Sequence, residues 1–149
     1  MNNRRSAEPG PVEYVQQSWP ADPEHAPEAR AVLRRWLRSL HLGGDETEGI
    51  LLAASEAVDN AVHHAYPTGQ DGSFEVKLWI EPGMLHVDIA DQGHWRDTEG
   101  GQTGRGIVLM RSLVKSVVIN VGRSGTCVSL YQPIPTEIQT VESRASKSG

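Results

Sequence analysis

The sequence has one cysteine, Cys127, among its 149 residues, so it cannot form an internal disulfide. It also lacks the excess of basic residues that a binder of nucleic-acid backbone needs, because its formal net charge is -5. No segment approaches the roughly 20 apolar residues of a membrane helix. The N-terminal stretch lacks the basic start and apolar run of a signal peptide. We therefore expect a soluble, cytoplasmic protein that engages neither nucleic acid nor membrane.

The length and the local composition predict one domain with flexible ends. A chain of 149 residues is within the usual size range of a single domain. Residues 1–11 are polar and contain two prolines, and residues 133–149 are rich in Ser, Thr, Glu and Lys with little apolar periodicity. We expect a flexible N-terminus over 1–11, one folded domain over 12–132 and a disordered tail over 133–149.

The hydrophobic periodicity predicts strands and helices in an α+β order. Strands are expected at 12–19, 74–80, 84–91, 117–121 and 127–131, and the last four form two hairpins around short turns. A helix is expected to start near Asp22 and Pro23, and a longer one to cover 45–66. A glycine-rich loop at 94–106 should lead into a short helix. This order predicts a two-layer α/β sandwich whose mixed, mostly antiparallel sheet is covered on one face by helices.

The longer predicted helix carries polar side chains beside its apolar face. Glu56 and Asn60 lie four residues apart, so they point the same way from neighbouring turns, and His64 continues this row. A carboxylate and a carboxamide are thereby brought together. In isolation, the pair is more typical of an ordinary solvated helix face. The adjacent His63 and His64 point about 100° apart, and the sequence offers no third ligand near them. A metal site at this pair is therefore disfavoured.

An acid and a glycine follow the predicted strand 84–91. Asp91 is placed at the strand end, where its carboxylate can accept a hydrogen bond from the amino group of a base. Gly93 permits close approach of the backbone to a ring. An acid that caps the turn is the alternative interpretation.

The segment GGQTGRG at 100–106 runs directly into the apolar residues 107–110. Glycines before a helix expose backbone N–H groups beside a partial positive charge, which favours an anion such as phosphate. The pattern is neither a P-loop nor a Rossmann turn. A simple flexible loop remains the alternative, and the Gly125-Thr126 pair further along is uninformative alone.

The order of these motifs carries a family resemblance. SEAVDNAVHHAY at 55–66, DQG at 91–93, GRGIVLM at 104–110 and GT at 125–126 together resemble the ATPase superfamily of gyrase, histidine kinases and mismatch-repair proteins. Within that superfamily the sequence is most similar to the anti-sigma factor serine kinases, over residues 12–132. The resemblance implies the histidine-kinase-like (Bergerat) fold.

The resemblance also implies an ATP site with magnesium. It implies that Asn60 holds the Mg²⁺ that bridges the ATP phosphates and that Glu56 is the general base. Asp91 would accept from the adenine amino group, with Gly93 along the ring and Thr126 supporting the contact. The residues that would close over the phosphates are Gly104, Arg105 and Gly106.

The function implied is that of a serine/threonine protein kinase. It would phosphorylate an anti-sigma factor antagonist and, when that antagonist is absent, sequester a sigma factor, as a homodimer. The alternative is an ATP-binding interaction module with little or no transfer. A histidine-kinase catalytic domain is a third interpretation, disfavoured because no upstream helix carries a phosphoacceptor histidine.

Two positions depart from the family pattern. His94-Trp95 replaces a second glycine after Gly93, and Gln102-Thr103 stands where an arginine often precedes the lid glycines. Arg105 is the only arginine between these glycines. The departures bear on the rate of phosphate transfer more than on ATP binding.

Overall fold

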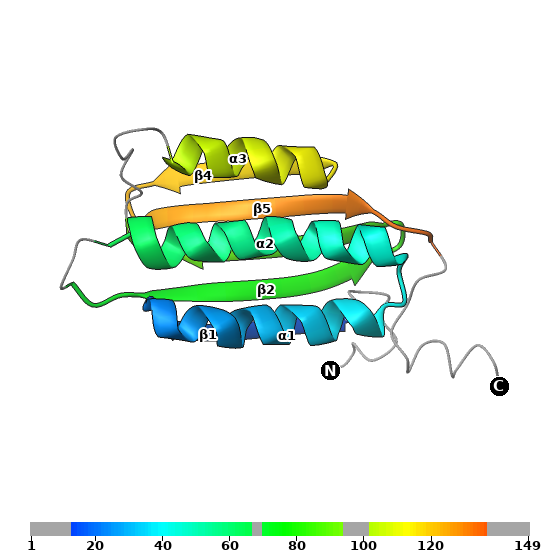
Figure 1. The fold of residues 1–149 in the computed structure, drawn as a ribbon, viewed down its shortest axis with the longest axis horizontal. Coiled ribbons are helices and arrows are strands. Elements are labelled where there is room, and N and C mark those ends of the chain that lie inside the picture. The colour runs from blue at the N-terminus through cyan, green and yellow to red at the C-terminus, as the bar shows by residue number, and fades with distance from the viewer. Residues whose placement is uncertain (1–12, 67–69, 94–101, 137–149) are drawn as a thin grey trace, which may run out of the picture.

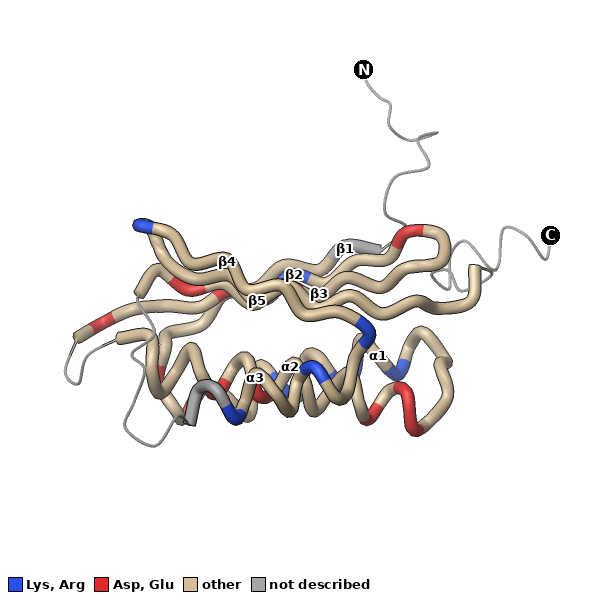
Figure 2. Tube along the Cα trace, turned by 90° about the horizontal axis from the view of Figure 1, so that it is seen from above, with Lys and Arg blue, Asp and Glu red and all other residues tan. Residues whose placement is uncertain are grey.

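The computed structural model describes residues 13–66, 70–93 and 102–136. These residues form two layers, a five-stranded sheet and a layer of helices that covers one of its faces (Figures 1 and 2). The strands lie in the order β1-β2-β3-β5-β4, and the described pairings are all antiparallel. The expected two-layer α+β fold is therefore confirmed, with an antiparallel rather than a mixed sheet.

The elements follow the sequence order closely. The strands are β1 (Glu13–Pro20), β2 (Ser73–Glu81), β3 (Met84–Asp91), β4 (Ser116–Gly122) and β5 (Gly125–Pro133). The helices are the short 3-10 helix η2 (Pro23–His25), α1 (Ala26–Ser39), α2 (Gly44–His64) and α3 (Gln102–Leu113). Among the described residues, none of these helices is long and apolar enough to cross a membrane.

Alternation along the strands places the core between the two layers. In β2, every second residue from Phe74 to Ile80 is buried, and the register pairs these residues with the buried positions of β3. Gly83 closes this hairpin with a φ of 84°, a conformation that favours glycine. The two central strands thus present one apolar face to the helices.

The helices contribute complementary faces. Leu33 and Leu37 of α1 and its C-cap residue Leu40 are buried, while Arg34, Arg35 and Arg38 are exposed. The buried face of α2 is rich in alanine, including Ala54, Ala57 and Ala61, and such small side chains allow the helix to lie close to the sheet and to α1. Helix α2 lies between α1 and α3 in the helical layer (Figure 1).

Two boundaries differ from expectation. Helix α3 begins at Gln102, so Gly104, Arg105 and Gly106 belong to its first turns rather than to a loop. Glycine costs about 1 kcal/mol in a helix interior, but at Gly106 it leaves room for the Glu56 carboxylate of α2. Beyond the expected domain end, Ile134 is buried and its N–H donates to the Gly83 carbonyl, so packed structure continues past residue 132. Residues 1–12 and 137–149 lie outside the described residues.

Candidate functional site

Four chain segments meet at one end of the molecule, on the left in Figure 1. They are the C-terminal end of α2, the end of β3, the start of α3 and the start of β5. These segments carry the residues that the sequence motifs single out. Distant parts of the sequence are therefore brought to one place.

Asp91 and Thr126 are directly opposed partners in the register of β3 and β5, and both are buried. The N–H of Gly93 donates to Oδ1 of Asp91 at 3.0 Å, so the carboxylate also stabilises the turn that follows it. Gly125 has a φ of 141°, and a Cβ at this position would overlap the backbone of Asp91. The two strands can approach this closely only because residue 125 is glycine.

Tyr66 holds the same turn from the end of α2, a role that the sequence analysis did not assign. Its hydroxyl donates to the Ser73 carbonyl at 2.6 Å and accepts from the Gln92 N–H at 2.8 Å. A Cβ on Gly93 would overlap the Ala65 carbonyl. Glycine is required at position 93 because the backbone there lies against Ala65, at the C-terminal end of α2. The only sequence signal for Tyr66 was its place at the end of the motif.

Glu56 and Asn60 face the start of α3. A Cβ on Gly106 would lie 2.9 Å from Oε2 of Glu56 and 3.5 Å from Nδ2 of Asn60. Asn60 is buried, whereas Glu56 is half-buried. With the helical rise of 1.5 Å per residue, Asn60 and Glu56 lie roughly 7 and 13 Å along α2 from the Ala65 end. The site therefore begins at Asp91, at the end of β3, and continues along α2 as far as Glu56.

The charge of Glu56 is affected by its surroundings. Burial, and secondarily the negative charge of Asp59, raises the pKa of Glu56 above its ordinary value of 4.5. Nη1 of Arg30 on α1 lies 3.4 Å from Oδ1 of Asp59 and partly balances that charge. A carboxylate with a raised pKa is a stronger base than an ordinary one, and this suits proton abstraction near neutral pH.

Two buried polar atoms in this region have no hydrogen-bond partner among the described residues. They are Nδ2 of Asn60 and Oγ1 of Thr126. A buried polar atom without a partner costs about 1–3 kcal/mol, so its presence calls for an explanation. The other three such atoms in the described segments are ring nitrogens of Trp19, Trp36 and His86. A polar ligand that bonds Asn60 and Thr126 would remove both deficits.

The other residues that the sequence motifs single out lie on α3, outside the described residues or at the end of α2. Gly104 lies in the first turn of α3, and Arg105 is exposed on the same helix. His94, Trp95 and the glycines at 100 and 101 lie outside the described residues. The ring centroids of His63 and His64 are 6.3 Å apart, and Nδ1 of His63 lies 3.0 Å from the Asp59 carbonyl oxygen.

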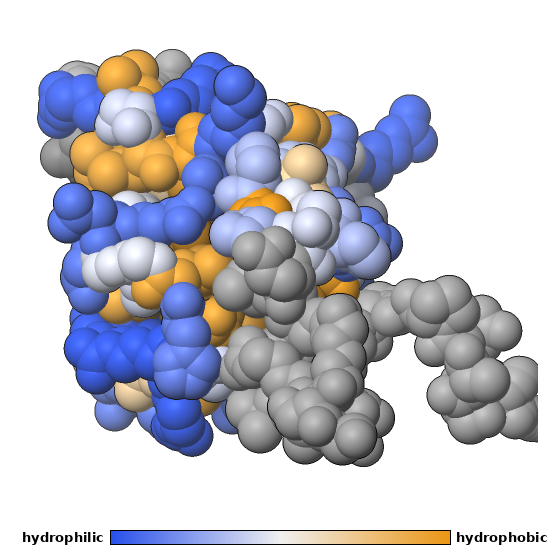
Figure 3. Space-filling model, turned by 90° about the vertical axis from the view of Figure 1, so that its right-hand side faces the viewer, coloured by the Kyte–Doolittle hydropathy of each residue, from blue (hydrophilic) through white to orange (hydrophobic). Residues whose placement is uncertain are grey.

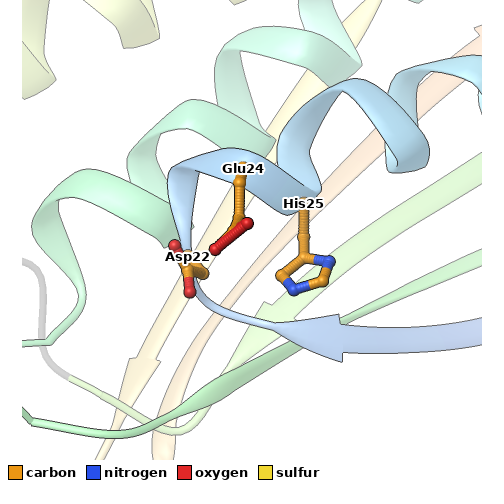
Figure 4. Close-up of side chains that lie close together, drawn as sticks. All are labelled: Asp22, Glu24 and His25. Carbon is orange, nitrogen blue, oxygen red and sulfur yellow. The ribbon is translucent and has the colours of Figure 1, made fainter.

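A second cluster of possible ligand groups lies at the turn between β1 and α1. Asp22, Glu24 and His25 bring their ligand atoms within 4.8 Å of one another (Figure 4). Nδ1 of His25, however, already lies 3.2 Å from Oε1 of Glu28. Acidic groups at a helix start also stabilise the helix dipole, which accounts for Glu24 and Glu28.

The fold and the order of the motifs are those of one protein family. The model of the histidine kinase-like ATPase domain family matches residues 19–132, most of the chain. The chain belongs to this family.

Within it, the chain is similar to serine-protein kinases RsbW and to anti-sigma F factors. The chain is 29% identical over 136 residues to a serine-protein kinase RsbW of Bacillus velezensis, an alignment that covers 80% of this chain and 84% of that protein. It is 26% identical over 120 residues to an anti-sigma F factor of Geobacillus kaustophilus, with coverage of 71% and 82%. The expected resemblance to the anti-sigma factor serine kinases is confirmed.

A solved structure agrees with these relatives. The crystal structure of the RsbU and RsbW domains of Rv1364c from Mycobacterium tuberculosis matches with a TM-score of 0.67 and 26% identity over 86% of this chain. The match spans 35% of that longer protein. A match to RsbW of Bacillus licheniformis, at 32% identity over 95 residues, covers 64% of this chain and spans 59% of that relative.

Proposed function

We propose that this chain is an ATP-dependent serine/threonine protein kinase that acts as an anti-sigma factor. The observation that carries the proposal is the row of Glu56 and Asn60 against Gly106 in a chain of the histidine kinase-like ATPase family. Buried atoms of Asn60 and Thr126 that have no partner in the described part of the chain support it. The names of the relatives, serine-protein kinase RsbW and anti-sigma F factor, support the choice of substrate class.

Asp91 provides the recognition of adenine in this proposal. Its carboxylate is buried and, when ionised, only accepts hydrogen bonds, whereas the adenine amino group is a donor. We infer that the hydroxyl of Thr126, which lies opposite Asp91 in the register and has no hydrogen-bond partner within the described residues, adds a second polar contact to the base. Because Tyr66 and Gly125 fix the turn and the strand pair, the carboxylate is held in position before the nucleotide binds.

Asn60 is the residue that we assign to magnesium. A carboxamide oxygen is a suitable ligand, since Mg²⁺ prefers oxygen and takes only one or two protein ligands beside phosphate and water. The amide can present either terminal atom, because its oxygen and nitrogen exchange places on rotation. When bound, MgATP supplies the phosphoryl group and screens the charge of its oxygens. We propose that Gly104, Arg105 and Gly106 contribute N–H groups and positive charge to the phosphates, which is supported by their place at the start of α3.

Glu56 is the proposed general base. One turn before Asn60, it accepts the proton of the serine or threonine hydroxyl as that oxygen attacks the terminal phosphorus. Its raised pKa strengthens this basicity. As the new O–P bond forms, the bond from the terminal phosphorus to the bridging oxygen breaks, ADP leaves with that electron pair, and the proton stays on the Glu56 carboxyl.

The proposed partners are an anti-sigma factor antagonist, which accepts the phosphate, and a sigma factor. We also propose that the chain forms a homodimer and acts in the cytoplasm, where transcription takes place. A formal net charge of -5 favours basic partner surfaces in the encounter step.

One mixture tests the proposal. Purified chain, MgATP and each purified antagonist protein of the source organism are incubated, and the antagonist is weighed by mass spectrometry. We expect the mass of one phosphate on a serine or threonine of one antagonist. ATP binding without transfer to any antagonist would favour the interaction module instead.

A further inference from the structure

A groove of about 450 Å³ crosses the outer face of α2, away from the nucleotide end. Its walls come from all three helices. On the side of α1 lies Arg34, on the side of α3 lies Leu113, and the floor belongs to the N-terminal half of α2. The lining residues on α2 are Asp45, Glu48, Gly49, Leu51, Leu52 and Ser55.

The groove is lined in part by leucine. Leu52 is 48% exposed and lines the groove together with Leu51 and Leu113. Hydrophobic atoms gather on the helical side of this end of the molecule, bordered by hydrophilic ones (Figure 3). A Cβ on Gly49 would lie 3.3 Å from the Leu113 carbonyl, so the end of α3 packs directly against α2 there. A partner's apolar side chain placed on Leu52 would remove apolar surface from water.

The charged residues that line the groove are unevenly distributed. Asp45 and Glu48 are exposed at one end, near the start of α2, and Arg34 stands on the α1 side. An occupant that matches this pattern carries a basic side chain beside its apolar one, directed at the two acids. Charge complementarity therefore restricts the chemistry of the partner.

The groove is aligned with the proposed base. Leu52 and Glu56 are one helical turn apart on the same face of α2, a rise of about 6 Å, and Ser55 lines the groove next to Glu56. A protein docked on Leu52 would thus have a neighbouring segment at Glu56. Among the partners, only the phosphate acceptor must bring a hydroxyl to that position.

We propose that this groove is the docking site for the acceptor protein, which inserts an apolar side chain beside Leu52 and directs a basic side chain to Asp45 and Glu48. The inference rests on the proposed kinase function and adds the surface that selects its substrate. Docking on Leu52 positions the acceptor hydroxyl at Glu56 without any contribution to the binding of ATP.

The test uses Leu52→Glu, with Val121→Glu as the matched control because Val121 is 70% exposed on β4, in the other layer. Phosphate transfer to each purified antagonist is measured against antagonist concentration, and ATP affinity is measured separately by calorimetry. We expect Leu52→Glu to raise the KM for the antagonist roughly tenfold or more, with kcat and ATP affinity little changed. Val121→Glu should behave as wild type.

A second variant protects the test against a folding defect. Glu48 is exposed, so Glu48→Lys is tolerated by the fold, and it should raise the same KM through repulsion of the basic side chain. Wild-type KM values in both variants would overturn the groove while leaving the kinase function intact. Loss of sigma-factor binding alone, with normal transfer, would also overturn it. If the wild-type chain phosphorylates no antagonist, the proposed function fails and the docking site fails with it.

Discussion

Gly106 of α3 faces Glu56 of α2 so closely that a methyl group at position 106 would lie 2.9 Å from the carboxylate oxygen Oε2. Two residues 50 positions apart in the sequence therefore meet at the proposed base. Glycine at this position costs some helical stability and leaves the Glu56 carboxylate undisturbed.

Gly106→Ala should separate site geometry from stability. Alanine is favoured over glycine in a helix by up to about 1 kcal/mol, so the free energy of unfolding should fall little or even rise. The methyl group forces the Glu56 side chain to shift, and phosphate transfer should drop. Gly44→Ala at the start of α2 meets no atom within 4 Å and is the control. Equal transfer rates in both variants, measured by mass, would argue against a site at Gly106.

Asp91→Asn should abolish high-affinity ATP binding. The amide would place a donor against the adenine amino group and lose the charge-assisted bond. Asp88→Asn is the matched control, because Asp88 lies on the same strand but on the opposite face of the sheet. Calorimetry on folded protein should find ATP affinity reduced roughly tenfold or more only for Asp91→Asn. Unchanged affinity would remove the adenine assignment.

Tyr66→Phe should weaken ATP binding without touching the nucleotide. The hydroxyl bonds both Ser73 and Gln92, and its loss leaves the Gln92 N–H without that partner, at a cost of about 1 kcal/mol. We expect lower ATP affinity and faster hydrogen exchange at Gln92. Tyr131→Phe, on β5, serves as the control. Exchange at Gln92 that matches wild type would show that the turn holds without Tyr66.

The pH dependence of transfer should follow the raised pKa of Glu56. The base is active when ionised, so the transfer rate should rise with pH through a midpoint above 4.5. Because Asp59 contributes to the shift, Asp59→Asn should move this midpoint to lower pH. The expected displacement is read from the rate profiles of the two proteins. A midpoint that stays in place or moves upward would contradict the coupling.

The same pKa has a consequence for stability. Between pH 4.5 and the raised pKa, the folded state binds more protons at Glu56 than the unfolded state does. The extra proton on Glu56 stabilises the folded state below that pH window. This stabilisation is lost as the pH rises through the window. Glu56→Gln should therefore lose this part of the pH dependence, as urea titrations at several pH values would reveal.

The sequence predicted the strands and helices well because their burial follows simple periods, as in Phe74 to Ile80. The start of α3 was missed because glycines at 104 and 106 are typical of loops, and the sequence does not show the contact of Gly106 with Glu56. Tyr66 and Ile134 were missed because their partners, Gln92 and Gly83, are distant in sequence. The opposition of Asp91 and Thr126 required the strand register, which motif spacing does not determine.

Glu56→Gln tests the central claim most directly, because the change keeps the shape of the side chain and removes its basicity. ATP affinity should stay close to wild type, while phosphate transfer to the antagonist falls by roughly 10²- to 10⁴-fold, the usual contribution of a general base. Asn60→Ala, measured beside it, should instead weaken magnesium-dependent ATP binding. A Glu56→Gln variant that transfers phosphate at the wild-type rate would contradict the proposed mechanism.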